Sequence, residues 1–349
     1  MHSCRLSPLQ RFLLVFLGAM LLAAGVLLYQ VHHFLHTAPE HPGTPLVVRI
    51  SPGMSFSAIA ALLESKGIVV DRTRFALLGR FMNKAGSVRA GEFTLHTGWT
   101  PMQVLEELGR GRDILYPLTI PEGLTWWQTA DLVQASGLGT RQGFARIVSD
   151  RDFLARWHIP GDNAEGYLFP ETYLFPRVAI TTPGNTPTEQ DLAIANHLLA
   201  MFREKTKELF PPDMSPEAIR DILTLASLVE KETSRDDERA RIAGVYANRL
   251  RKNMRLQCDP TIIYGIGPDF DGNLTRKHLR DRSNPYNTYM HPGLPPGPIC
   301  SPGLASIKAA LHPESHTYLY FVARGDGSHA FSRTLREHNQ YVRTYQLHR

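Results

Sequence analysis

The sequence predicts an α+β protein with an N-terminal transmembrane helix, a small α+β subdomain and a larger domain of mixed helices and strands. Residues 12–31 form an apolar run without a charged residue. Beyond it, short apolar strand patterns alternate with amphipathic helix patterns, and 349 residues suit about two domains of roughly 150 residues each. A composition of 43% hydrophobic and 20% charged residues is globular, which excludes a wholly disordered or fibrous protein.

The apolar run 12–31 reads FLLVFLGAMLLAAGVLLYQV, and about 20 such residues span the hydrocarbon layer of a bilayer. Arg5 and Arg11 precede it without an acid, so we expect residues 1–11 to stay in the cytoplasm and the rest to be periplasmic. A cleaved signal peptide is the alternative. Its apolar region is usually about 7–15 residues long and ends at small residues, whereas this run is longer and continues into His32.

Five segments follow from this pattern. We expect a cytoplasmic end at 1–11, a membrane helix at 12–31, a proline-containing linker at 32–46, a small domain at 47–114 and a large domain at 115–349. In the small domain, strands are predicted at 46–50 and 91–95, and helices near 59–63, 72–82 and 100–108. In the large domain, strands are predicted at 115–120, 318–323 and 330–332, and helices at 126–134, 189–209, 216–233 and 236–252. Residues 284–303 are rich in Pro and Gly and predict a long ordered loop.

The helix predicted at 216–233 is the first candidate for chemistry. Ser215 is a favourable N-cap and Pro216 suits the first helical position. Glu230 and Glu232 lie at the opposite end, where the helix dipole disfavours a carboxylate and raises its pKa, as a general acid requires near neutral pH. Such acids are usually solvated, and the helical wheel places Glu230 nearer the apolar stripe. The residues alone therefore leave both glutamates open.

Several motifs carry a resemblance to a known family. They are LASLVEKET (225–233), VYANRL (245–250), MRLQCDPT (254–261), PYNTY (285–289), GLPPGPI (293–299) and EGYLFPETY (165–173). In order and spacing the chain resembles the YceG-like family, the membrane-anchored endolytic murein transglycosylases of bacteria, over most of residues 47–345. The resemblance implies a LysM-like small subdomain and a YceG-like catalytic domain at 115–349.

The resemblance also implies a lyase that acts on peptidoglycan glycan strands. In this family the second glutamate of the EKET motif is the catalytic acid and base, and it matches Glu232. This group protonates the glycosidic oxygen between MurNAc and GlcNAc, then takes the proton of the muramic C6 hydroxyl. The hydroxyl closes a 1,6-anhydro ring, so no water, metal or cofactor is needed. We expect this reaction to terminate strand elongation or to set strand length.

A sugar-binding groove needs aromatic faces together with hydrogen-bonding groups. The loops 285–289 and 254–261 offer both, and Glu165 is a further acid that either lines the groove or has a structural role. The predicted substrate-binding residues are Gln257, Asp259, Tyr286, Asn287, Tyr289 and Glu165.

Other signals receive less weight. His312 and His316 flank an acid, but Pro313 breaks helical spacing and no metal site is expected. Cys258 and Cys300 depart from the family pattern, and a disulfide between them is a hypothesis, because disulfides persist outside the membrane. The net charge of +5 is compatible with an anionic polymer but too small to indicate nucleic acid.

Two other functions stay open. The first is a non-catalytic, membrane-anchored peptidoglycan-binding protein. The second is a lysozyme-type hydrolase that pairs Glu232 with Asp259 or Glu165. The expected partners are glycan strands and, through the resemblance, the synthases that polymerise them. The expected location is the inner membrane, with a single membrane pass.

Overall fold

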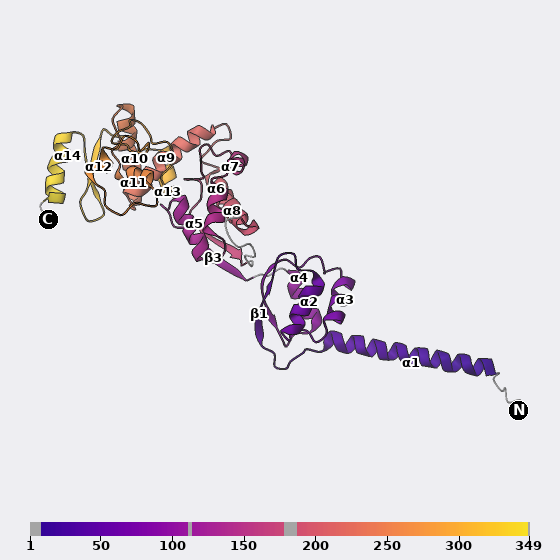
Figure 1. Cartoon of the computed structure of the whole chain (residues 1–349). Helices are drawn as coiled ribbons and strands as arrows, with labels where there is room; N and C mark the ends of the chain where they lie inside the picture. Colours follow the sequence, from indigo (N-terminus) through magenta and orange to yellow (C-terminus); the bar gives the residue numbers. More distant parts are fainter. Residues whose placement is uncertain (1–7, 111–113, 178–186, 348–349) are drawn as a thin grey trace. The chain divides into compact units, whose positions relative to one another are not determined.

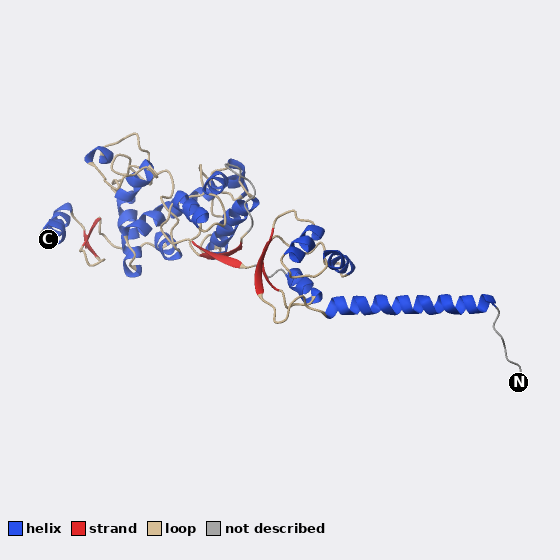
Figure 2. Ribbon diagram, turned by 60° about the horizontal axis from the view of Figure 1, so that its bottom comes forward, coloured by secondary structure: helices blue, strands red, loops and turns tan. Residues whose placement is uncertain are grey.

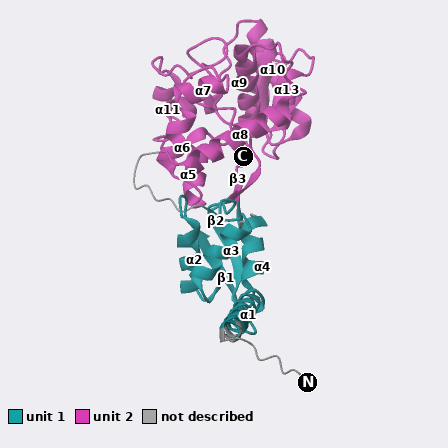
Figure 3. Cartoon of the chain, turned by 90° about the vertical axis from the view of Figure 1, so that its right-hand side faces the viewer, with its two compact units in different colours: residues 1–116, 176–179 teal, residues 117–175, 180–349 magenta. Residues whose placement is uncertain are grey.

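The computed structural model of the chain describes residues 8–110, 114–177 and 187–347. It divides into two compact units, one of residues 1–116 with 176–179 and the other of residues 117–175 with 180–349 (Figure 3).

The N-terminal helix α1 (Pro8–His36) contains the predicted apolar run (Figure 1). From Phe12 to His36 it is long and apolar enough to cross a membrane, a test that a secretory signal sequence also passes. Its described apolar side chains are exposed up to Val31. The helix does not end there: His32 to His36 contain no helix breaker, and Phe34 packs against the core of the first unit. The predicted linker at 32–46 is therefore wrong over its first five residues.

The soluble part of the first unit is built in the order β1 (Pro45–Ile50), α2 (Phe56–Ser65), α3 (Arg72–Phe81), β2 (Gly91–His96) and α4 (Pro101–Arg110). The two strands pair antiparallel, from Pro45 opposite His96 to Ile50 opposite Gly91. Ser55 and Asp71 cap the two central helices through their side chains. One face of each element forms a single core, whose larger members are Val48, Ile50, Ile59, Leu63, Phe75, Phe93, Leu95 and Leu105. Every element predicted in this unit is present.

The second unit is mainly helical, and its described strands are short (Figure 2). Its elements are β3 (Leu115–Thr119), α5 (Trp126–Ala135), α6 (Arg141–Val148), α7 (Arg151–Arg156), β4 (Thr172–Pro176), α8 (Glu189–Thr206), α9 (Pro216–Glu232), α10 (Asp236–Arg251), α11 (Asp259–Ile266), α12 (Arg276–Leu279), α13 (Leu304–Leu311), β5 (Tyr320–Ala323), β6 (His329–Ser332), α14 (Leu335–Val342) and a terminal π-helix (Arg343–Leu347). Among the described residues the sheets have two strands each, β3 with β4 and β5 with β6.

Helix α9 lies at the centre of the elements that build the site. It packs against α10 and α13, and its apolar stripe includes the buried residues Leu223, Ala226 and Val229. The segment 284–303 contains no helix or strand, as predicted, and it supplies the buried residues Ile299 and Cys300. Because these buried groups fix the segment against α9, it is an ordered loop.

Candidate active site

Glu232 is the last residue of α9, and its position follows from how the helix ends. Ser215 caps the start of the helix, with Pro216 in the first turn. Thr233 at the C-cap has an extended backbone (φ −149°, ψ 140°), so the chain leaves the helix directly after Glu232. Helix α10 begins at Asp236 and packs back against α9. The carboxyl group of Glu232 is therefore placed where two helices and their connection meet.

The two carboxyl oxygens of Glu232 have different surroundings. Oε1 accepts a hydrogen bond from the hydroxyl of Tyr246 at 2.9 Å and one from Sγ of Cys258 at 3.2 Å. No residue in the described part of the chain makes a hydrogen bond to Oε2. One oxygen is thus held by the protein, and the other is available to a ligand.

Burial raises the pKa of Glu232 above the ordinary value of a glutamate. The hydrogen bonds from Tyr246 and Cys258 and the charge of His329 oppose this rise, while the negative charge of Asp259 adds to it. Because burial is the largest effect, Glu232 keeps its proton to higher pH than a solvated glutamate does. That is the property of a general acid.

Glu232 lines a cavity of about 450 Å³, within the range that small-ligand sites occupy. The wall comes from the end of α9, from α10, from the segment 256–260, from the β5–β6 hairpin and from α14. Three predicted substrate-binding residues, Gln257, Asp259 and Tyr289, lie in this wall together with Glu232.

The two loops that carry these residues are joined by hydrogen bonds. Thr288 accepts a bond from the backbone N–H of Cys258 at 2.9 Å, and its carbonyl accepts one from the N–H of Gln257 at 3.2 Å. Gln257 has a left-handed backbone (φ 52°), which is uncommon for a residue other than glycine. Tyr289 donates to Asp259 at 2.7 Å. Both loops are therefore held in one arrangement beside Glu232.

Tyr286, Asn287 and Glu165, the other predicted binding residues, are not in the cavity wall. The ring of Tyr286 lies 4.8 Å from that of Tyr264. Asn287 is fully buried, and its amide donates to the carbonyls of His278, Leu279 and Asp281. These bonds hold the loop that precedes Tyr289.

Glu165 is almost fully buried, and its Oε2 accepts a bond from the backbone N–H of Trp126 at 3.1 Å. Burial raises its pKa to about 8. Glu171, the other acid of this motif, is partly exposed and pairs with Lys205 at 3.1 Å. Both acids are thus engaged outside the cavity that contains Glu232.

The structure separates the two glutamates that the sequence left open. Glu230 accepts a hydrogen bond from the backbone N–H of Gly303 at 3.1 Å and is not part of the cavity wall. Its charge also contributes, after burial, to the raised pKa of Glu122. The helical wheel places Glu230 nearer the apolar stripe, but Glu232 is the one of the two that lines the cavity. Through its hydrogen bond Glu230 joins α9 to Gly303, the residue that precedes α13.

Cys258 and Cys300 are buried free thiols, so the hypothesis of a disulfide between them is wrong. Each thiol has its own acceptor: Cys258 donates to Glu232, and Cys300 to the carbonyl of Ser227 at 3.5 Å. The departure at Cys258 thus places a thiol directly on the candidate catalytic carboxylate.

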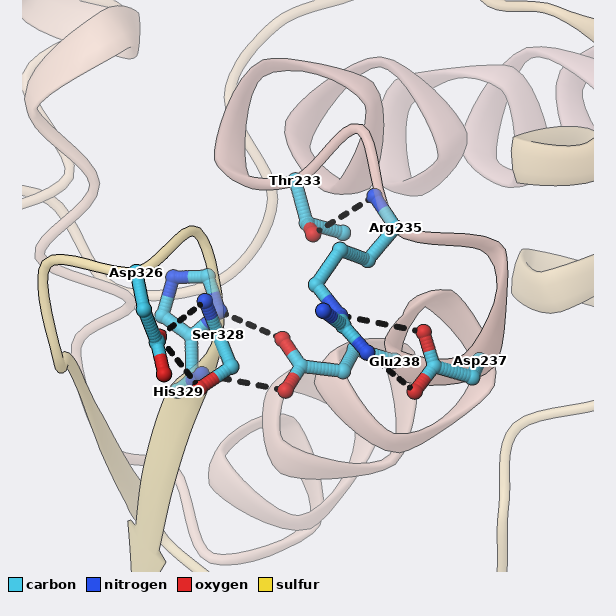
Figure 4. Close-up of polar contacts among 7 residues, drawn as sticks. All are labelled: Thr233, Arg235, Asp237, Glu238, Asp326, Ser328 and His329. Carbon is cyan, nitrogen blue, oxygen red and sulfur yellow. Dashed lines mark hydrogen bonds and ion pairs between the residues drawn. The ribbon is translucent and has the colours of Figure 1, made fainter.

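Sequence reasoning missed two groups of this site. Tyr246 was noted only as part of a family motif. His329 is not among the predicted binding residues; in the structure its Nδ1 lies 2.6 Å from Oε2 of Glu238, and its backbone N–H donates to Oε1 of the same residue at 3.0 Å (Figure 4). The pairing of an acid near the start of α10 with a histidine 91 positions later leaves no local signal. In the ranges 8–110, 114–177 and 187–347, no three His, Cys, Asp or Glu side chains gather as a metal site.

Comparison with known proteins places the chain in a family. The model of the YceG-like family matches residues 48–344. A protein named endolytic murein transglycosylase from Bacillus subtilis is 30% identical over 344 residues, which cover 93% of this chain and 91% of that protein. A protein of the same name from Streptococcus pneumoniae is 31% identical over 89% of this chain, which spans 60% of its length. A crystal structure of a yceG-like protein from Listeria monocytogenes matches with 32% identity and a TM-score of 0.52, covering 85% of this chain and 99% of that one. The chain belongs to the YceG-like family.

Proposed function

We propose that this protein is an endolytic peptidoglycan lytic transglycosylase. It cleaves the glycosidic bond between MurNAc and GlcNAc inside glycan strands and leaves 1,6-anhydro-MurNAc ends. One observation carries the proposal: Glu232, with a raised pKa and one unengaged oxygen, lines a cavity together with Gln257, Asp259 and Tyr289. The names of the relatives agree with this activity.

A single carboxyl group performs both proton transfers. Protonated Glu232 gives its proton to the glycosidic oxygen as the bond to the anomeric carbon breaks. The carboxylate then takes the proton of the muramic C6 hydroxyl, whose oxygen bonds to the anomeric carbon and closes the anhydro ring. The hydrogen bonds from Tyr246 and Cys258 stabilise the carboxylate between the two steps. Atoms and charge balance without water or a cofactor.

Sugar binding is assigned to the side chains beside Glu232. Tyr289 offers an aromatic face, and Gln257 and Asp259 offer hydrogen-bonding groups to sugar hydroxyls. Tyr286 and Asn287 act indirectly, by holding the loop that presents Tyr289. Glu165 stabilises the fold around α5 instead of contacting glycan.

A lysozyme-type hydrolase is the second candidate, and the position of Asp259 favours it. This second acid lines the same cavity as Glu232, as a two-carboxylate mechanism requires. In the lyase reading, Asp259 is held by Tyr289 and acts on substrate binding and on the pKa of Glu232.

The N-terminal helix α1 is proposed to anchor the protein in the inner membrane, with its N-terminus in the cytoplasm and the catalytic unit in the periplasm. The strand–helix–helix–strand order of residues 45–96 supports a LysM-like subdomain at 47–114, followed by a YceG-like domain at 115–349. An enzyme so placed meets nascent glycan near the synthases that make it, and its cuts terminate or limit strand elongation.

Digestion of isolated glycan strands followed by mass spectrometry tests the proposal. The wild type is expected to release products with 1,6-anhydro ends. Reducing ends, one water heavier, would assign the hydrolase, and intact strands would assign a non-catalytic binding protein. Glu232→Gln is expected to lose nearly all cleavage while its thermal unfolding stays unchanged. Glu230→Gln is the matched control, because it lies two residues away on the same helix and outside the cavity.

A further inference from the structure

Helix α3 of the first unit carries large apolar side chains that are not covered by the protein. Leu77 is 59% exposed and Phe81 is 88% exposed, while Phe75 of the same helix lies in the core. Exposed apolar side chains grouped on one side of a helix mark an interaction site more often than isolated ones do.

These side chains border a groove that also contains the end of α1. The groove encloses about 510 Å³ and is lined by Leu27, Val31 and Phe34 of α1 and by Leu77, Leu78 and Phe81 of α3, among others. Phe34 joins α1 to the core of this unit, so the two sides of the groove belong to one packed body.

The groove lies at a defined depth if α1 crosses a membrane, as proposed above. Residues 12–31 are just long enough to span the hydrocarbon layer of about 30 Å. Leu27 therefore lies in the leaflet on the side of the first unit, and Val31 lies at the surface of that leaflet. Since Leu77 and Phe81 line the same groove as these two residues, α3 lies at the level of the lipid headgroups and the ends of the acyl chains.

We propose that α3 docks on the outer leaflet of the membrane that α1 crosses, with Leu77 and Phe81 inserted among the lipids. The apolar groove continues the lipid-facing surface of α1, and this continuity identifies lipid as its occupant. Helix α3 also carries Arg72, Arg74 and Arg80 and no acid, a composition typical of helices at a membrane interface. Arg72 and Arg74 pair with acids outside the helix. The proposal rests on the membrane anchor and not on the catalytic reaction.

The test uses the full chain reconstituted in phosphatidylcholine vesicles, with or without bromine on the acyl chains. A tryptophan is introduced by Phe81→Trp, or by Val47→Trp as a control at an exposed strand position outside the groove. The fluorescence added by Phe81→Trp over the wild type is expected to fall at least twofold in brominated vesicles. The fluorescence added by Val47→Trp is expected to stay unchanged.

Each other outcome has a distinct meaning. Equal quenching at the two positions, or none at position 81, overturns the docking of α3 when the protein resists extraction by alkaline carbonate. Extraction by carbonate instead shows that α1 is not an anchor, and the docking proposal fails with it. Absent bromine quenching together with cross-links between copies at position 81 assigns the patch to a second copy of the chain and overturns the proposal.

A second inference concerns His329 and rests on the proposed function. Its ring forms part of the cavity wall, and its Nδ1 is bonded to Glu238, which is itself buried. The turn before His329 is also fixed, because Asp326 accepts bonds from the N–H and hydroxyl of Ser328 at 2.9 and 2.7 Å (Figure 4). No residue in the described ranges makes a hydrogen bond to Nε2 of His329.

We infer that Nε2 of His329 binds a hydroxyl of the sugar whose glycosidic oxygen Glu232 protonates, and that Glu238 is the positioning residue that orients the ring. A hydroxyl both donates and accepts, so it satisfies Nε2 in either protonation state of the imidazole. A carboxylate on the other ring nitrogen is the usual device that holds a functional histidine in one orientation. Substrate hydroxyls therefore have a fixed partner in the same cavity wall as Glu232.

A double-mutant cycle on glycan cleavage tests this inference. His329→Gln is expected to lower kcat/KM at least tenfold, with most of the change in KM, and Glu238→Gln is expected to act in the same direction. The kcat/KM of the double variant is expected to be little lower than that of His329→Gln alone, because both substitutions disrupt the same pair of His329 and Glu238. His312→Gln, at an exposed position, is the control.

Two results would overturn the role of His329. One is wild-type kcat/KM in a folded His329→Phe variant, which keeps a flat ring but has no hydrogen-bonding atom. The other is full additivity of the two substitutions. If the wild type produces no anhydro ends at all, the proposed function itself has failed, which the product analysis reports separately.

Discussion

The hydroxyl of Tyr246 donates a 2.9 Å hydrogen bond to Oε1 of Glu232, and this bond joins the middle of α10 to the last residue of α9. Tyr246 is fully buried, so the bond is screened from water. It stabilises the ionised form of Glu232 and offsets part of the effect of burial on its pKa.

Tyr246→Phe is therefore expected to raise the pKa of Glu232. A reaction that begins with protonated Glu232 loses kcat/KM as the pH rises through this pKa, so the falling limb of the pH profile should move to higher pH. The maximal rate should fall roughly tenfold or more, because a hydrogen bond to a charged group is lost.

Glycan cleavage measured between pH 4 and 9 checks this prediction. Tyr318→Phe, which removes a hydroxyl outside the cavity wall, serves as the control. A falling limb that stays in place, or moves to lower pH, would contradict the assignment of Glu232 as the general acid.

Burial of Glu165 makes the stability of the second unit depend on pH. Its pKa is raised to about 8 in the folded protein, against about 4.3 in an unfolded chain. Between these values the folded state keeps a proton that the unfolded state has lost. The free energy of unfolding should therefore fall by up to about 1.4 kcal/mol per pH unit as the pH rises from 5 to 8, and level off above that.

Glu165→Gln is expected to remove this slope, since an amide stays neutral at every pH. Thermal unfolding at several pH values measures it, with Glu171→Gln as the control at a partly exposed acid of the same motif. The prediction fails if Glu165→Gln and the wild type lose stability in parallel over this range.

Substitution of Asn287 distinguishes a structural role of this residue from direct glycan binding. Its amide makes three hydrogen bonds to backbone carbonyls in the interior, so Asn287→Ala leaves those carbonyls unpaired and opens a small cavity. The expected loss is about 2–3 kcal/mol in the free energy of unfolding, measured by urea denaturation. Asn273→Ala, at an exposed loop position, should cost less than about 0.5 kcal/mol. Unchanged stability with a raised KM for glycan would instead favour direct contact.

Local patterns were sufficient to predict much of the framework. The start of α9 is encoded by Ser215 and Pro216, and its long apolar stripe made the helix evident. The first unit was equally readable, because its strands and helices alternate between clear turn residues. Helices α11 and α13, with eight residues each, were missed, since such short apolar segments carry almost no periodic signal.

The residues that surround Glu232 could not be predicted from local sequence patterns. The helical wheel ranks residues by one helix alone, and on that basis Glu230 looked better buried. The partners of the two glutamates come from elsewhere: Tyr246 and Cys258 for one, the backbone of Gly303 for the other. Only the packing of α9 against distant segments separates their roles, and the same holds for His329 and Glu238.

Asp259 provides the sharpest distinction between the two enzymatic readings. Its negative charge raises the pKa of Glu232, so Asp259→Asn is expected to lower that pKa. The falling limb of the pH profile should then move to lower pH, opposite to the shift expected for Tyr246→Phe. In a lyase the products of Asp259→Asn keep their 1,6-anhydro ends, although KM rises because the bond with Tyr289 is weakened.

A hydrolase that uses Asp259 as nucleophile or base would instead lose at least about a thousandfold in kcat with Asp259→Asn, because the amide can neither attack carbon nor activate water. Mass spectrometry of the products and the pH profile of the same variant measure both consequences. Gln257→Asn is the matched comparison, since it shortens a neutral side chain in the same wall and leaves the charge near Glu232 unchanged. If Asp259→Asn still cleaves glycan and leaves 1,6-anhydro ends, and if the falling limb of its pH profile lies at lower pH, both proton transfers are assigned to Glu232 alone.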